Sequence, residues 1–120
     1  MNTATQTEIN DFLFKFKFFA QIPGQFSFVE RHKNLQALAD LGITQVEALN
    51  AILQLTYRNY SSGPEPDRDY YGRKVWIFGY SLEGEEIYIK LADDLSYNIA
   101  KCISFHKADF TIAYPYQGGD

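Results

Sequence analysis

The strongest constraint on the fold is a predicted β-hairpin between residues 74 and 92. The segments KVWIFGYS and EIYIKLA are rich in β-branched and aromatic residues, and they flank LEGE, a turn sequence that contains glycine. A second turn segment, DDLSYN, leads into a third strand-like run, IAKCISFH. The second half of the chain is therefore predicted to form a short antiparallel sheet, one face of which other elements must cover.

The first half of the chain supplies predicted helices. Thr5 and Glu8 have the spacing of a capping box, which satisfies free N–H groups at a helix start. The apolar residues that follow recur at helical intervals: Ile9, Phe12, Leu13, Phe16 and Ala20. Phenylalanine and lysine also alternate between residues 12 and 19, which is typical of a strand, but the capping box favours a helix.

Two further helices are predicted after a break at Pro23-Gly24 and one short strand at residues 26–29. The first covers about residues 34–41 and ends at Gly42, in the preferred left-handed cap position. Residues 44–47 repeat the capping-box spacing and open the next helix. Its predicted apolar face consists of Val46, Leu49, Ile52 and Leu53. The turn between these two helices is very short, which predicts a helical hairpin.

The polar segment YRNYSSGPEPDRDYYGR, residues 57–73, is long for a connection inside a compact domain, which indicates either function or local disorder. The closing segment AYPYQGGD predicts an irregular tail that frames one end of the sheet. The sequence has no internal repeat and no linker. We therefore expect a single α+β domain spanning residues 1–120, with flexible tails at 1–8 and 115–120.

The composition narrows the class of protein further. The lone Cys102 excludes an intramolecular disulfide and, with only His32 and His106, excludes a Cys/His zinc cluster. The sequence shows no secretory signal and no apolar stretch long enough to cross a bilayer, so we expect a cytoplasmic protein with no membrane partner. The net charge of −4 argues mildly against a nucleic-acid partner, although basic clusters at 15–33 and 68–74 allow a local basic face.

Alternation along two strands gathers polar groups on one face of the predicted sheet. In the middle strand the apolar residues point one way: Ile87, Ile89 and Leu91. In the last strand two sets alternate, with Ala100, Cys102, Ser104 and His106 on one face and Ile99, Lys101, Ile103 and Phe105 on the other. If both apolar faces look towards the helices, Tyr88, Lys90, Ser104 and His106 share the open face. An imidazole, a phenol and an ammonium there can move protons and stabilise charge on a phosphate without a metal.

The presence of these residues can also be explained without any function. Lys90 can be a solvated charge, His106 a surface or capping histidine, and Cys102 a small buried hydrophobe. The basic segment 31–33 can be a solvated helix junction. No metal site is predicted from the four loop carboxylates, which lack ligand-like spacing: Asp67, Asp69, Asp93 and Asp94.

The order of several segments resembles the MqsR family of bacterial toxins: FVERHKN, LADLGIT, LTYRNYSSGPEPD, VWIFGYSLEGEEIYIKL, CISFH and YPY. The resemblance runs from about Phe12 to Tyr116, and IYIKL followed by CISFH is its most specific part. Members of this family are RelE-like ribonucleases of type II toxin–antitoxin systems. The resemblance implies a RelE-like α+β fold, with helices on one face of the sheet and RNA on the other. It also implies cleavage of single-stranded mRNA without metal or cofactor, and inhibition by a cognate antitoxin.

Carried over by position, Tyr88 and Lys90 match the tyrosine and lysine of the family's middle strand, and with His106 they are the predicted catalytic residues. His106 stands where members can carry a basic residue after Ser-Phe, which leaves open whether it is acid, base or phosphate contact. The candidate RNA contacts are Arg31, Lys33, Arg73, Lys74, Tyr70 and Tyr71. Two other functions remain open: an inactivated toxin that only binds a partner, which the acidic net charge favours, and an enzyme for a small anionic metabolite.

Overall fold

The computed structural model describes residues 3–117, within which three α-helices pack on a five-stranded sheet. The helices and strands follow in the order α1 (Gln6–Ala20), β1 (Phe26–Phe28), α2 (His32–Leu41), α3 (Gln45–Leu53), β2 (Tyr60–Pro66), β3 (Lys74–Leu82), β4 (Glu85–Ala92) and β5 (Ala100–Lys107). Two short 3₁₀ turns, η1 (Tyr57–Asn59) and η2 (Leu95–Tyr97), lie between them. The predicted α+β class is confirmed.

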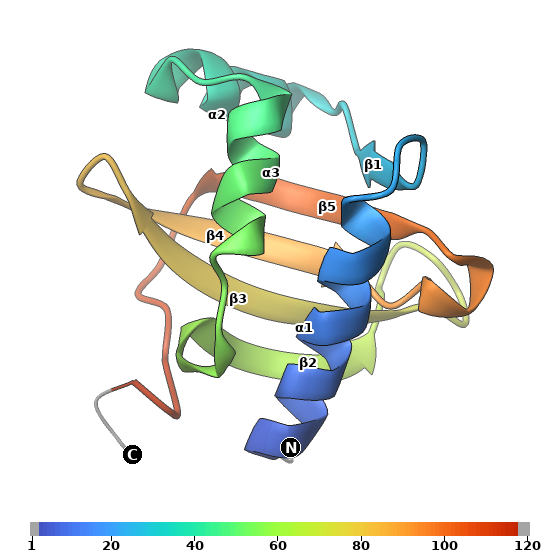
Figure 1. Ribbon diagram of the computed structural model, residues 1–120. Helices are drawn as coiled ribbons and strands as arrows, with labels where there is room; N and C mark the ends of the chain where they lie inside the picture. The colour runs from blue at the N-terminus through green and yellow to red at the C-terminus, as the bar shows by residue number, and fades with distance from the viewer. Residues whose placement is uncertain (1–2, 118–120) are drawn as a thin grey trace.

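The sheet has the strand order β1-β5-β4-β3-β2 (Figure 1). The pairs β2–β3, β3–β4 and β4–β5 are antiparallel, whereas β1 runs parallel to β5 with Phe26 opposite Ala100. The sheet is therefore mixed, and the prediction of a purely antiparallel sheet was wrong. A short strand was predicted at residues 26–29 and forms at residues 26–28. Its pairing with β5 was not predicted, because the sequence does not show which distant strand it joins or in which direction.

The first helix begins at the predicted capping box. Thr5 Oγ1 accepts a hydrogen bond from the Glu8 N–H at 3.1 Å, and Glu8 Oε1 accepts one from the Thr5 N–H at 2.8 Å. Phe12 and Phe16 are buried one turn apart, while Phe14 between them is exposed. The helical prediction is confirmed and the competing strand is wrong.

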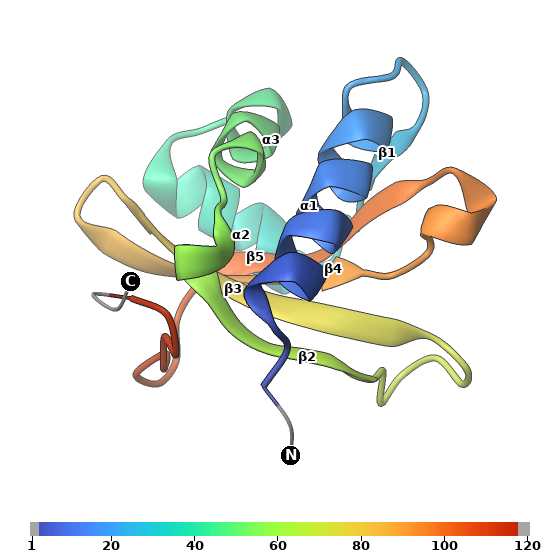
Figure 2. The same cartoon turned by 60° about the horizontal axis from the view of Figure 1, so that its bottom comes forward.

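One face of the sheet is covered by α1 and α3 (Figure 2). The ring of Phe12 on α1 stacks on Trp76 of β3 at 4.5 Å between centroids. The largest buried side chains of this core include Phe16, Ile52, Phe78, Ile87, Ile89, Leu91 and Phe105. The apolar faces predicted for α1 and β4 are therefore confirmed.

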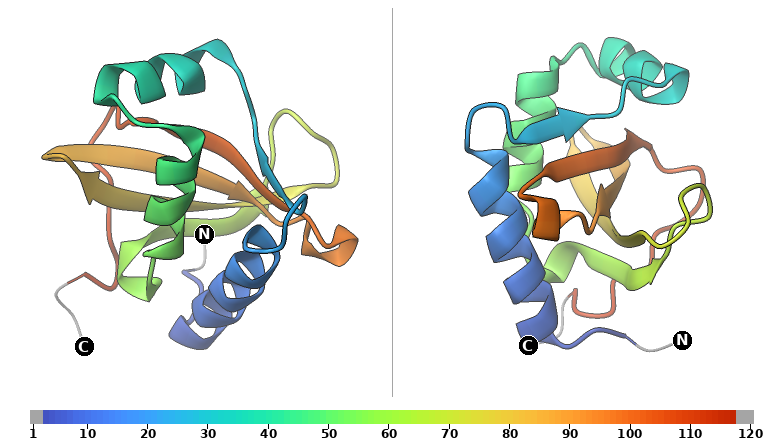
Figure 3. Two further views of the ribbon diagram at one scale, coloured as in Figure 1. Left: turned by 45° about the horizontal axis from the view of Figure 1, so that its top comes forward. Right: turned by 90° about the vertical axis from the view of Figure 1, so that its right-hand side faces the viewer.

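The two other helices differ from the prediction in detail. α2 begins at His32, two residues before the predicted start, and ends at Gly42 with a left-handed φ of 68°. α3 begins at the predicted capping box but buries Ala48, Ala51 and Ile52, whereas Val46 is 67% exposed. The face of α3 that joins the core therefore consists of two alanines and one isoleucine. Figure 3 shows α2 and α3 at a steep angle, so they do not pack side by side as the predicted hairpin.

The segment predicted as a long loop contains a strand. Residues 60–66 form β2, an edge strand that pairs with β3 through two register shifts. The fully buried Tyr60 holds it in place, because its hydroxyl donates to the Gly63 carbonyl at 2.5 Å and accepts from the Ala4 N–H at 3.1 Å. The loop prediction was therefore wrong for this part of residues 57–73.

Both expected tails contact the domain where they are described, in residues 3–8 and 115–117. Ala4 is buried, and the Tyr116 hydroxyl donates to its carbonyl oxygen at 2.6 Å. Tyr114, just before the second tail, donates to Glu86 Oε2 at 2.7 Å. The closing segment thus lies along the sheet end, and the remainder of both tails lies outside the described residues. Among residues 3–117, no helix combines the length and apolarity needed to cross a membrane.

Candidate active site

A pocket of about 400 Å³ lies on the open face of the sheet, opposite α1 and α3. Five of its lining residues were predicted for the site from sequence: Arg31, Lys33, Tyr88, Lys90 and His106. Ser104, Asp109 and Phe110 complete it. β4, β5, the start of α2 and the segment after β5 thus contribute to a single site.

The pairing of β4 with β5 brings the predicted catalytic residues together. Tyr88 lies directly opposite His106, and Lys90 lies directly opposite Ser104. Side chains of directly opposed residues in an antiparallel pair lie on the same face. The prediction that these four residues share the open face is confirmed.

A bulge in β5 changes the faces predicted for the residues before it. Lys90 is opposite Ser104 but Leu91 is opposite Cys102, so Ile103 is one residue extra. Cys102 therefore turns into the core beneath the helices, and Ile103 packs on the open face instead, contrary to the predicted alternation. Cys102 is fully buried, which confirms it as a small buried side chain, and burial raises the pKa of its thiol to about 12.

The bulge is held by Asn34, a fully buried residue of α2. Its Nδ2 donates to the carbonyl oxygens of Val29 and Ile103, each at 2.8 Å, and its Oδ1 accepts from the Phe105 N–H at 3.1 Å. These bonds give backbone groups of Val29, Ile103 and Phe105 hydrogen-bond partners. They also fix the start of α2 beside β5, which places Arg31 and Lys33 at the pocket.

His106 is the proton-transfer candidate of the pocket, and its side chain is only 8% exposed. Its Nδ1 lies 2.9 Å from the carbonyl oxygen of Lys107. Because a carbonyl only accepts hydrogen bonds, Nδ1 carries the proton, and Nε2 of the neutral ring has the free lone pair. Burial lowers the pKa of His106 below its usual 6.5; the bond to Lys107 opposes this shift, and Lys33 adds to it. The imidazole is therefore neutral at pH 7 and can act as a base.

Tyr88 belongs to a row of three rings. It stacks on the His106 ring at 5.3 Å between centroids and meets Phe110 edge-on at 5.8 Å. Burial raises the pKa of the Tyr88 phenol, and the Glu65 carboxylate adds to the rise while Arg31 opposes it. The phenol stays protonated at neutral pH and can donate a proton. Phe110 is 63% exposed at the edge of the pocket.

Positive charge surrounds these rings. Arg31 donates to the hydroxyl of Ser104, which is buried at the bottom of the pocket. Lys33 pairs with Asp109 at 2.5 Å, and Lys33 lowers the pKa of that carboxyl below its usual value. Lys90 adds a third cation from β4. A guanidinium has five N–H donors, so Arg31 retains donors for a bound anion after bonding Ser104.

The other predicted RNA contacts do not line this pocket. Arg73 is largely buried, and it bonds Asp67 at 2.8 Å, approaches Asp94 at 3.7 Å and lies 4.4 Å from the Tyr70 ring centroid. Although burial opposes the shift, hydrogen bonds from the Asp69 N–H and from Arg73 lower the pKa of Asp67. Arg73 thus stabilises its own loop. The remaining candidates, Tyr70, Tyr71 and Lys74, are exposed.

Sequence reasoning missed three residues that build the site. Asp109 and Phe110 follow the last predicted strand in a segment without periodicity, so no pattern indicated that it returns to the sheet. Asn34 was included in a predicted helix without a role. An Asn at a buried helical position is itself a signal, because a buried amide must find partners.

The arrangement can bind an anion and move a proton beside it. A neutral imidazole and a protonated phenol stand next to one another, and three cations can stabilise charge that develops on a phosphate. Within residues 3–117, no group of three or more His, Cys, Asp or Glu side chains is placed to hold a metal ion.

Comparison with known proteins does not identify a family for this chain. No family model, curated protein or solved structure matches the chain significantly.

Proposed function

We propose that the protein is an endoribonuclease that cleaves single-stranded mRNA without a metal, as the toxin of a toxin–antitoxin pair with a RelE-like arrangement. One observation carries the proposal: a buried imidazole and a phenol lie beside three cations on the open face of the sheet. Cleavage of a phosphodiester by its own 2′-OH requires a base, an acid and a charge stabiliser. The resemblance of IYIKL and CISFH to the MqsR family adds the toxin class.

In the proposed reaction Nε2 of His106 takes the proton of a ribose 2′-OH. The 2′ oxygen then attacks the adjacent phosphorus, and the bond from phosphorus to the 5′ oxygen breaks. The Tyr88 phenol gives its proton to that leaving oxygen, so the products are a 2′,3′-cyclic phosphate and a 5′-OH. Lys90 and Arg31 offset the negative charge that grows on the phosphoryl oxygens. Proton exchange with water restores both residues.

The exposed ring of Phe110 supports a single-stranded substrate. It stands beside Tyr88 at the edge of the cationic pocket and offers a face for one unpaired base. A base in a duplex is already stacked and cannot reach such a ring without being displaced. We therefore assign the nucleotide next to the cleaved bond to this ring.

Cleavage of a defined RNA in excess chelator tests the proposal. The matched substrate is the same oligonucleotide with one 2′-deoxy nucleotide at the cleaved position. The protein should cut the RNA, leave a 2′,3′-cyclic phosphate and spare the 2′-deoxy substrate. Cutting of both substrates, or activity that chelator abolishes and magnesium restores, would contradict this mechanism.

Expression in a bacterial host tests the biological role. The protein alone should arrest growth, and co-expression of the antitoxin encoded beside it should relieve the arrest. Normal growth with folded protein that binds RNA without cutting it would favour the inactivated binding module. The acidic net charge of −4 is the observation on the side of that second function.

A further inference from the structure

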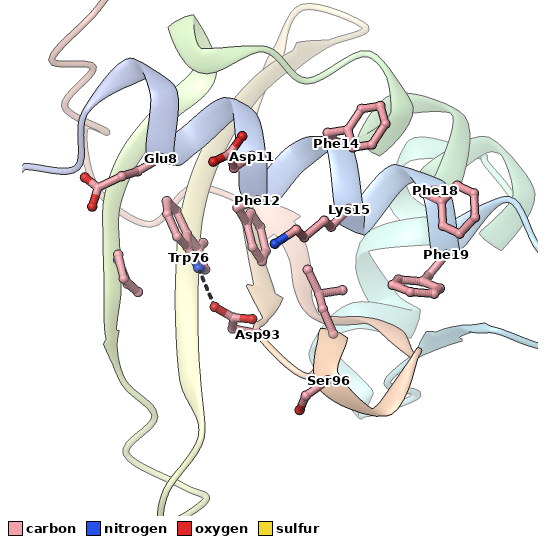
Figure 4. A pocket seen from close by; sticks show the side chains of 12 residues that line it. Glu8, Asp11, Phe12, Phe14, Lys15, Phe18, Phe19, Trp76, Asp93 and Ser96 are labelled. Carbon is pink, nitrogen blue, oxygen red and sulfur yellow. Dashed lines mark hydrogen bonds between the residues drawn. The ribbon is translucent and has the colours of Figure 1, made fainter.

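A second and larger concave surface lies on the helix side of the molecule, away from the proposed active site. This groove has a volume of about 800 Å³ and follows α1 along one side (Figure 4). Trp76 of β3 and Leu95 of η2 lie opposite the helix, and Pro64 of β2 extends this wall. None of the residues proposed for RNA cleavage lines it.

The groove displays aromatic side chains that the core does not use. Phe14 is 74% exposed and Phe18 is 56% exposed, and they stand one turn apart on α1. Phe12, in contrast, is buried against Trp76. Two large exposed rings that lie side by side at one groove indicate an interaction surface. Exposed apolar side chains that have no such role are usually scattered singly over a protein surface.

The charges at the groove are mainly acidic. Three carboxylates, Glu8, Asp11 and Asp93, stand against the single ammonium of Lys15. Asp93 accepts a hydrogen bond from the Trp76 indole at 3.2 Å, and Glu8 caps the helix start. Among the described residues, Asp11 has no ion pair. An occupant that brings positive charge would meet complementary charge here.

We propose that this groove binds a basic amphipathic helix of a partner protein. From Glu8 to Phe19, α1 contributes eleven residue steps to the groove, or roughly 16 Å at about 1.5 Å per residue. That length accommodates about three turns of a second helix, whose apolar stripe would pack on Phe14 and Phe18. Its lysine or arginine residues would approach Asp11 and Asp93.

Two other occupants fit less well. A second copy of this chain, docked about a two-fold axis, would set the same acidic groove against itself. An added β-strand would need free N–H groups on the edge strand β2, but Pro64 and Pro66 remove donors there. A helix carries its own hydrogen bonds and needs only side-chain contacts.

Selection from a displayed library of peptides of about 14 residues tests the proposal, since this length covers the groove as a helix. The intact protein is the bait, and the double variant Phe14→Ser, Phe18→Ser serves for counter-selection. Enriched peptides should combine apolar residues at positions i, i+3, i+4 and i+7 with lysine or arginine. Enriched acidic peptides, peptides without helical periodicity, or no enrichment against the double variant would overturn it.

The protein contains one tryptophan, Trp76, so its fluorescence reports directly on the groove. An enriched peptide should change this fluorescence on titration, and Phe18→Ser or Asp11→Lys should weaken its binding about tenfold or more. Val46→Ser on α3 is the matched control, because Val46 is an apolar residue with 67% exposure, between those of Phe14 and Phe18, but lies outside the groove. Unchanged affinity in the groove variants, or dimerisation of the free protein that Phe18→Ser abolishes, would overturn the proposal in favour of no partner or a second copy.

Discussion

The side-chain oxygen of Asn34 accepts a hydrogen bond from the backbone N–H of Phe105 at 3.1 Å, which ties α2 to the bulged strand β5. The same amide donates to Ile103 on the other side of Ser104. Ser104 and His106 therefore have their positions set by a residue that contacts neither the proposed substrate nor solvent. Asn34 is therefore a buried residue that positions two side chains of the candidate active site without lining the pocket.

Asn34→Ala should destabilise the fold by about 2–4 kcal/mol, because it leaves buried backbone groups of Val29, Ile103 and Phe105 without partners. Urea unfolding followed by circular dichroism measures the change in the free energy of unfolding. Asn50→Ala is the control, since Asn50 is exposed on α3. Equal stability of the two variants would show that the bulge does not need the amide.

Lys90→Ala should slow RNA cleavage roughly a hundredfold or more, because a charge stabiliser acts mainly on the transition state. The substitution should leave the fold intact. Lys90 is half-buried on the open face, and its loss opens no cavity in the helix-side core. Lys101→Ala, on β5 and outside the pocket, is the matched loss of one positive charge. Single-turnover rates on the same RNA compare the variants. Equal losses of cleavage rate in the two variants would show that Lys90 contributes only general positive charge.

His106 should make both activity and stability depend on pH in the same direction. Burial holds its folded pKa below the usual 6.5, so the unfolded chain binds its proton first as the pH falls. The contribution of His106 to stability is thus fully present above pH 6.5 and declines as the pH drops towards the folded pKa. Cleavage should persist somewhat below pH 6.5 and then fall as the base becomes protonated.

The variant His106→Gln tests this pH dependence, because glutamine does not titrate. Its unfolding free energy should lose the slope that the wild type shows just below pH 6.5, and its cleavage rate should be low at every pH. Urea unfolding and cleavage assays over pH 5–8 give both profiles. An unchanged stability slope in the variant would assign the titration to another group.

Gly79→Ala should destabilise the protein by about 1–3 kcal/mol, because a methyl group there would come 2.1 Å from the Tyr114 hydroxyl. Tyr114 also bonds Glu86, so its ring is not free to move away without losing that contact. In a Tyr114→Ala background the same substitution should cost far less. A double-mutant cycle by urea unfolding measures the coupling, and a zero coupling energy would mean that the ring moves away freely.

Local signals in the sequence predicted much of this structure. Both capping boxes, the left-handed glycine after α2 and the hairpin around residues 82–85 act over a few residues and formed as expected. β2 was missed because YSSGPEP has the composition of a turn, and only pairing with β3 makes it a strand. Strand formation of this kind depends on tertiary context.

The residues of the candidate site were also predicted where local patterns determine their position and missed where tertiary contacts do. Tyr88, Lys90 and His106 were found by alternation, since no bulge interrupts β5 between Ser104 and His106. Ile103 was misplaced because the bulge depends on the amide of Asn34, far away in sequence. Arg73, a predicted RNA contact, lies outside the pocket, and its ion pair with the buried Asp67 could not be predicted because it forms only in the folded loop.

The place of β4 in the sheet has a consequence for how the domain opens. β4 lies between β3 and β5, whereas β1 contributes three residues at one edge and β2 forms the other. Amide hydrogens of β4 should exchange with solvent only on global unfolding, and those of the two edge strands should exchange through smaller fluctuations. Tyr88 and Lys90 thus belong to a strand whose amide hydrogens are expected to exchange slowly. Arg31 and Phe110 belong to irregular segments at the margin of the pocket, which can adjust to a ligand while the side chains proposed to react stay fixed.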